Sequence, residues 1–170
     1  VACNTASSVS LPTLKRHLHI PILGVIEPGA KTAVLLSNKK NIGVIGTLGT
    51  VKSNSYKKAL HIFDGKVNVS QHPCPLFVQL AEEGWHNNII AQNVSNEYLK
   101  SFRGKNIDAL ILGCTHYPLL KNVIQKTVGS KVELIDSGRE TAKEVKRILE
   151  KKNLLTEQRK KNQSIFYVSD

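Results

Sequence analysis

Residues 107–120 have the sequence IDALILGCTHYPLL, and this stretch decides the fold that we predict for the chain. Its first part, residues 107–112, is a short and mostly apolar run that is typical of a buried parallel strand. Gly113 permits a turn after this strand, and Pro118 suits the first turn of a helix. Cys114 therefore follows the carboxyl end of a strand, which is the edge where open α/β sheets bind their ligands.

Three polar or reactive side chains follow one another in the loop after this strand: Cys114, Thr115 and His116. They form a candidate reactive centre, although a buried cysteine followed by a helix-capping threonine accounts equally well for this loop alone. The start of the chain favours a reactive centre, because Cys3 is likewise followed by a polar pair, Asn4 and Thr5, in the sequence VACNTAS. Two similar loops in one chain indicate two similar halves that face one another.

The composition is that of a soluble globular protein. Of the 170 residues, 41% are hydrophobic and 22% are charged. No apolar run approaches the roughly 18 residues of a membrane span, so we expect no membrane partner, and no signal peptide is recognisable. The three cysteines are odd in number and widely spaced, which argues against a disulfide framework and for reduced thiols in a cytoplasm.

The net charge of +11 arises largely from basic residues near the C-terminus. Nucleic-acid-binding proteins interleave such residues with aromatic ones or carry a recognised module, whereas 5% of this chain is aromatic and no such module occurs. A solvated, lysine-rich helix face is the favoured interpretation, and we expect no nucleic-acid partner. A basic nucleic-acid-binding module without catalysis remains the alternative from a different class of function.

Predicted strands alternate with predicted helices along the chain. Apolar runs predict strands over residues 22–26, 41–46, 67–69, 107–112, 132–135 and 165–168. Helical periodicity and capping residues predict helices over residues 7–19, 30–36, 52–62, 76–83, 87–102, 118–128 and 137–152. This alternation predicts an α/β fold of parallel βαβ units, with right-handed crossovers and helices on both faces of a doubly wound sheet.

Polar loops lie next to several predicted strands and should gather at one edge of the sheet. They contain residues 3–5, 47–50, 114–116 and 136–138. Thr47 and Thr50 in the second loop are either turn residues or contacts to a ligand, and the sequence leaves both interpretations open. The glycine-rich phosphate loops of dinucleotide and nucleoside triphosphate enzymes do not occur.

Two cysteines on opposed loops suit the exchange of a proton at a weakly acidic carbon. One thiolate removes the proton from one face, and one thiol delivers a proton to the other face. The ordinary thiol pKa of about 8.5 falls near a helix N-terminus, and we expect such a lowered pKa for Cys3 and Cys114. Asn4, Thr5 and Thr115 add side-chain donors for a carboxylate.

Metal and dithiol redox chemistry are disfavoured. Cys3, Cys74, Cys114 and His116 lack the CxxC or HxxxH companions of zinc sites and dithiol centres, so we expect no metal. Cys74 stands between two prolines ahead of an apolar helix, and we interpret it as structural. His116 either caps a helix or, beside the Cys114 thiol, relays a proton or holds a thiolate.

Six motifs follow one another along nearly the whole chain: VACNTAS, GVIEPGA, IGTLGTVKSNSY, CPLFVQLAEEG, LILGCTHYPLL and IDSG. Together they resemble the bacterial glutamate racemases of the aspartate/glutamate racemase superfamily. The resemblance implies a cofactor-independent isomerase that converts L-glutamate into D-glutamate for peptidoglycan. An aspartate racemase of the same superfamily is the alternative within this class.

The resemblance also implies roles for individual residues. Cys3 and Cys114 would exchange the α-proton on opposite faces of the substrate, with His116 and Glu82 assisting Cys114. Contacts to the substrate are implied for Asn4, Thr5, Thr47, Thr50, Thr115 and His116. Glutamate is the expected small-molecule partner, no cofactor is implied, and a homodimer of the full-length protein is allowed.

The family fold consists of two doubly wound α/β domains related by a pseudo-two-fold axis, with the site between them. The resemblance assigns residues 1–28 and 137–170 to the first domain and residues 29–136 to the second. Family members carry an Asp-Ser-Gly-Val-Gly-Gly loop and a Pro-Tyr-Gly loop ahead of VACNTAS, and neither occurs in these residues. We therefore expect a first domain that lacks its N-terminal portion, and no activity of the chain by itself.

Overall fold

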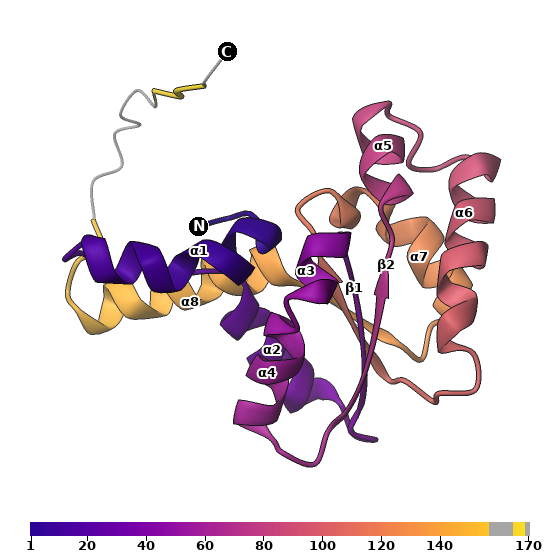
Figure 1. The fold of residues 1–170 in the computed structure, drawn as a ribbon, viewed down its shortest axis with the longest axis horizontal. Helices are drawn as coiled ribbons and strands as arrows, with labels where there is room; N and C mark the ends of the chain where they lie inside the picture. The colour runs from indigo at the N-terminus through magenta and orange to yellow at the C-terminus, as the bar shows by residue number, and fades with distance from the viewer. Residues whose placement is uncertain (157–164, 169–170) are drawn as a thin grey trace.

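Parallel strands form the centre of the structure, which is a computed structural model that describes residues 1–156 and 165–168. Within these residues the sheet has four strands, hydrogen-bonded in the order β2-β1-β3-β4 (Figure 1). Their bounds are β1 Asn41–Gly46, β2 Asn68–Pro73, β3 Ala109–Gly113 and β4 Glu133–Asp136. The predicted α/β class with a parallel sheet is therefore confirmed.

The order of the strands reverses between β1 and β3. The chain passes from β1 outward to β2, and then returns to the other side of β1 with β3 and β4. Residues Ile42 to Gly46 of β1 pair in register with residues Ala109 to Gly113 of β3. Such a reversal is the switch point at which open α/β sheets bind their ligands, and the loops after β1 and β3 both begin there.

Helices cover both faces of the sheet, as the doubly wound prediction requires (Figure 1). The α-helices are α1 Asn4–His17, α2 Ile26–Leu36, α3 Leu48–Lys52, α4 Ser55–Phe63, α5 Leu76–Glu82, α6 Ile89–Leu99, α7 Lys121–Val128 and α8 Ser137–Lys151. Two short 3₁₀ helices, η1 (Lys100–Phe102) and η2 (Tyr117–Leu120), precede β3 and α7.

Strand β3 is buried on both faces because its side chains alternate between two hydrophobic cores. Ala109 and Ile111 pack in one core with residues of α2 and α4. Leu110 and Leu112 pack in the other core with residues of α5, α6 and α7. Burial on both faces explains why the sequence of this strand is a continuous apolar run instead of an alternating pattern.

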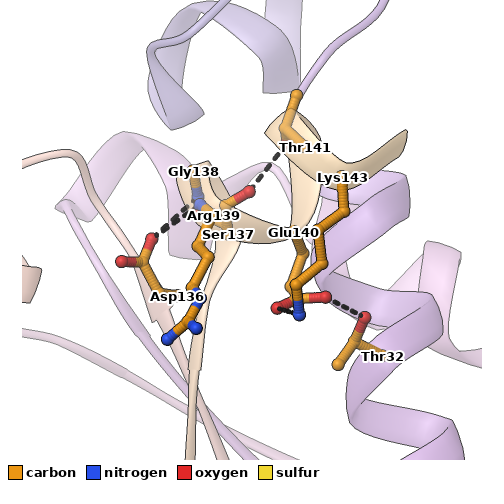
Figure 2. A network of polar contacts seen from close by, with 8 residues as sticks. All are labelled: Thr32, Asp136, Ser137, Gly138, Arg139, Glu140, Thr141 and Lys143. Carbon is orange, nitrogen blue, oxygen red and sulfur yellow. Dashed lines mark hydrogen bonds and ion pairs between the residues drawn. The ribbon is translucent and has the colours of Figure 1, made fainter. Parts of the chain in front are cut away.

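Helix α8 is held at the end of β4 and against α2 by polar contacts that Figure 2 shows. The Asp136 carboxylate accepts hydrogen bonds from the backbone amides of Gly138 and Arg139, at 3.0 and 3.1 Å, and so caps the helix. Glu140 lies one turn further along. It accepts a hydrogen bond from the Thr32 hydroxyl of α2 at 3.0 Å.

Two predicted strands are wrong. Residues 21–24 have no regular structure, and Ile26 already begins α2. A strand must pair its backbone groups with a neighbour, and among the described residues no strand runs beside this segment. Residues 165–168 form no strand either, and their side chains are exposed.

Several predicted helices have different bounds in the structure. The helix predicted over residues 30–36 begins at Ile26, so Pro28 lies in its first turn, where a proline costs no hydrogen bond. The helix predicted over residues 52–62 is two helices, α3 and α4, separated by Asn54 in a left-handed conformation. The helix predicted over residues 118–128 starts as the 3₁₀ helix η2.

Asp108 joins the segment after α2 to the start of β3. Its carboxylate accepts hydrogen bonds from the Ser37 hydroxyl at 2.6 Å and from the Lys39 backbone amide at 2.7 Å. Burial acts to raise the pKa of Asp108, but the hydrogen bonds to its carboxylate outweigh burial and hold the pKa below its ordinary value.

We predict that Asp108→Asn lowers the free energy of unfolding by about 1–2 kcal/mol at neutral pH, because hydrogen bonds to a charged group are lost. The folded-state pKa is the lower one, so this stabilisation is present above about pH 4 and disappears as the pH falls through the folded-state value. Urea unfolding across a pH series measures it. Glu97→Gln, which removes an exposed ion pair with Lys100, is the control and should have a small effect. A loss that does not depend on pH would contradict the prediction.

Candidate active site

Cys114 follows β3 directly, and its side chain is 7% exposed. Burial raises the pKa of its thiol, and the nearby Cys3 thiolate would raise the pKa further. Hydrogen bonds from the backbone amides of His116 and Thr115 and from the Thr115 hydroxyl oppose these effects without cancelling them. The expected lowering of the Cys114 pKa is therefore wrong in this structure, because loss of hydration outweighs the donors of the loop.

His116 lies between Cys114 and Glu82. Its Nδ1 atom is 3.7 Å from the Cys114 sulfur, and its Nε2 atom is 2.6 Å from a carboxylate oxygen of Glu82. Glu82 ends α5, and this helix is held beside the loop by edge-to-face packing of Phe77 on the Tyr117 ring. The structure thus brings together the three residues that were predicted to act on one side of the site.

The arrangement of these three groups resembles a relay. A carboxylate on one nitrogen of an imidazole orients the ring, and the other nitrogen then faces the thiol. Glu82 is exposed and His116 is partly buried, so the pair lies at the surface end of the relay while the Cys114 sulfur lies at its buried end.

Cys3 lies at the start of α1 and is exposed, in contrast to Cys114. Its sulfur accepts a hydrogen bond from the Ala6 amide at 3.4 Å, so the side chain caps the helix. Thr5, in the first turn of the same helix, contacts the loop after β1 and so holds the backbone of Cys3 near the switch point. The structure therefore brings the two predicted thiols to one region from different elements.

Three threonine hydroxyls make that contact between α1 and the loop after β1. The Thr5 hydroxyl oxygen is 2.8 Å from that of Thr47 and 3.2 Å from that of Thr50. Thr47 also caps α3, because its hydroxyl accepts a hydrogen bond from the Thr50 amide at 3.2 Å. The Thr47 hydroxyl therefore serves the turn, and a contact of Thr47 or Thr50 with a ligand stays a prediction.

Asn4 is buried at the centre of this region, with 2% of its surface exposed. Its Oδ1 atom accepts hydrogen bonds from the Tyr56 hydroxyl at 2.5 Å and from the Ser137 hydroxyl at 3.3 Å. Sequence reasoning did not select these two partners. Ser137 lies in a polar loop that the sequence shows at the end of a strand, whereas nothing in the sequence distinguishes Tyr56 from a tyrosine that only packs in the core.

A pocket of about 410 Å³ opens at this edge of the sheet. Its polar and reactive lining includes Asn4, Cys114, Thr115, Asp136, Ser137 and Thr141. A pocket of this size suits a small molecule, and its hydroxyl and amide groups suit a carboxylate ligand. The other predicted site residues are near the pocket through the contacts above but do not line it: Cys3, Thr5, Thr47, Thr50, Glu82 and His116.

A larger groove of about 720 Å³ lies between α1, α2, α4 and α8, and none of the predicted site residues lines it.

Several basic residues of α8 pair with acidic residues of the same helix, as Lys143 does with Glu140 and Arg147 with Glu144. In residues 1–156 and 165–168, no three His, Cys, Asp or Glu side chains are grouped as a metal site would require. Across the same described residues, every helix is too short or too polar to cross a bilayer.

A thiol, an imidazole and a carboxylate at the switch point of a doubly wound sheet are the parts of an enzyme that moves protons. Residues 1–145 match the family model for Asp/Glu/Hydantoin racemase. The chain belongs to this racemase family, whose members are isomerases, and the resemblance inferred from the motifs is confirmed.

Individual relatives agree with this assignment. The chain is 47% identical to the glutamate racemase of Geobacter metallireducens over all of its own length and 63% of that protein. It superimposes with a TM-score of 0.88 on a glutamate racemase isoform from Bacillus anthracis, at 42% identity, covering 91% of this chain and 58% of that one. A glutamate racemase from Francisella tularensis in complex with D-glutamate gives a TM-score of 0.83 at 37% identity, covering 92% and 58%. The chain thus spans less than two thirds of the length of these relatives.

Alkylation by iodoacetamide should follow the burial of the three cysteines. We expect the exposed Cys3 to react first, Cys114 more slowly, and the fully buried Cys74 last. The rate at Cys114 should still rise above about pH 9, because its pKa lies above the ordinary value of about 8.5. Mass spectrometry of the labelled peptides measures the order, and the chain unfolded in guanidinium, where all three should react alike, is the control. Equal rates at Cys3 and Cys114 in the folded chain would refute this difference in burial.

Proposed function

We propose that the protein containing this chain interconverts L- and D-glutamate by proton transfer through two cysteines. The observation that carries the proposal is the convergence of Cys3 and Cys114. They come from the N-terminus of α1 and the end of β3, and Ala2 and Asn4, the two neighbours of Cys3, line the same pocket as Cys114. A racemase needs two such groups, because the proton must leave one face of the α-carbon and return to the opposite face.

In the proposed reaction one cysteine begins as the thiolate and the other as the thiol. The thiolate takes the α-proton, and the electron pair of the broken C–H bond stays on the substrate. The thiol then gives its proton to the other face, so the two cysteines have exchanged their protonation states. His116 takes up or returns the proton of Cys114, and Glu82 stabilises the imidazolium while it holds that proton.

Glutamate is the proposed substrate, in part because the relatives described above are named glutamate racemases. We assign Asn4, Thr5, Thr47, Thr50, Thr115 and His116 to the binding of its polar groups. Their amide, hydroxyl and imidazole groups are suitable donors for two carboxylates. We further propose that the product serves peptidoglycan synthesis in the cytoplasm, a reducing compartment in which the three free thiols would persist.

The division of the chain into domains is also a proposal. Residues 29–136 would form one domain, which holds all four strands described here, and residues 1–28 and 137–170 would belong to the other. Under this division the Cys114 side of the site is complete within one domain. Cys3 is exposed among the described residues, and we propose that this chain by itself is inactive.

The decisive experiment follows α-proton exchange and optical rotation in D₂O with each enantiomer of glutamate and of aspartate. It uses the product of the complete open reading frame, with residues 1–170 in parallel. We expect glutamate to racemise with deuterium incorporation, and Cys3→Ser and Cys114→Ser each to lower kcat by at least about a hundredfold. Full activity in both variants would refute the two-cysteine mechanism, and a preference for aspartate would refute the assigned substrate.

Glu82→Gln tests the relay. We predict a fall in kcat of roughly tenfold with little change in KM, because the neutral amide no longer stabilises a charged His116. Glu83→Gln is the matched control, since Glu83 is the next residue, is also exposed, and makes no hydrogen bond or ion pair with His116 in the structure. The relay is refuted if the two variants have the same kcat.

A further inference from the structure

Tyr56 and Ser137 lie beneath the candidate site and face Asn4. Tyr56 has no exposed surface, and its ring lies against Gly113, where a Cβ atom would come within 3.0 Å of the ring. The Tyr56 ring therefore lies directly below Gly113, which ends β3 and precedes Cys114 in the sequence. Ser137, at the start of α8, is 2% exposed and reaches the same amide from the side of β4.

The two hydroxyls determine which end of the Asn4 amide faces inward. Burial raises the pKa of Tyr56, so its hydroxyl keeps its proton and acts as a donor. This donor makes a hydrogen bond to Asn4 Oδ1 at 2.5 Å, and the Ser137 hydroxyl lies within hydrogen-bonding reach of the same tyrosine. Rotating the amide by half a turn would place its NH₂ group against the tyrosine hydroxyl and would deprive a buried donor of that acceptor, which is costly.

Ser137 makes the weaker of the two contacts. Its single hydroxyl hydrogen is shared between Asn4 Oδ1 at 3.3 Å and the Leu112 carbonyl oxygen at 3.2 Å. The second acceptor belongs to β3, so Ser137 also ties the amide of Asn4 to the strand that carries Cys114. The two hydroxyls thus come from α4 and α8 and meet at one oxygen atom of α1.

We propose that Tyr56 and Ser137 are positioning residues that turn the Asn4 NH₂ group toward the pocket, where it donates to a carboxylate of the substrate. Asn4 lines the pocket beside Cys114 and Thr115, and with its Oδ1 atom occupied its Nδ2 atom is the group that it offers to a ligand. The inference rests on the proposed racemase function and adds to it two residues that do not contact the reacting carbon.

The test compares steady-state kinetics of the complete open reading frame product with those of Tyr56→Phe, which keeps the ring and removes the hydroxyl. We expect KM for glutamate to rise about five- to tenfold and kcat to change by less than about twofold, because the lost contact acts on bound substrate and transition state alike. Ser137→Ala should raise KM less, since its hydrogen is shared. Ser95→Ala is the matched control, because Ser95 is a buried serine of α6 whose hydroxyl donates to the Val123 carbonyl of α7 and not to Asn4.

A double-mutant cycle separates positioning from general stability. In an Asn4→Ala background, Tyr56→Phe should no longer raise KM, because the group that it positions is absent. A rise in KM of the same size in both backgrounds, or no rise in either, would overturn the inference while the wild type still racemises glutamate. Should Tyr56→Phe not fold, the same cycle with Ser137→Ala decides. An inactive wild type would instead overturn the proposed function, and the inference with it.

Discussion

The parallel pairing of β1 with β3 is the contact on which the rest of the site depends. The strands end together at Gly46 and Gly113, which lie opposite one another in the register. A Cβ atom at Gly113 would be 2.6 Å from the Ile45 carbonyl oxygen, so the strands could not stay this close if Gly113 carried a side chain. Because the strands are this close, the loops that follow them begin side by side, and α1 can contact one loop while its first residues approach the other.

Strands β1, β3 and β4 were predictable from the sequence because each contains a buried apolar run that a polar loop follows. Strand β2 is mostly polar and partly exposed, and the sequence predicted only its first residues. The run at residues 22–26 has the same composition, and its failure to form a strand could not be read from its residues. Strand formation depends on a neighbour, and Gly24 instead lies under α1, where a Cβ atom would collide with Leu11. Local pattern therefore predicted burial correctly for Val25 and Ile26 and predicted their backbone conformation incorrectly.

The candidate site was predictable to the extent that its chemistry lies in short motifs. Cys114 and His116 are neighbours in the sequence, whereas Glu82 was selected through family resemblance, since an exposed glutamate at a helix end carries no signal of its own. Tyr56 was missed because a buried tyrosine is ordinary. The pKa of Cys114 was predicted to be lowered and is raised instead, because the extent of burial depends on packing with residues outside the motif.

The unequal burial of the two thiols has a thermodynamic consequence. Enantiomers in water have equal free energies, so the equilibrium constant of a racemisation is unity, and the ratio kcat/KM must be the same in both directions however different the two bases are. In the proposed reaction, a buried Cys114 and an exposed Cys3 therefore could not favour one enantiomer as product. The difference between the two thiols can change kcat and KM for each enantiomer, but it cannot change the ratio kcat/KM. The enantiomer with the higher kcat must therefore also have the higher KM.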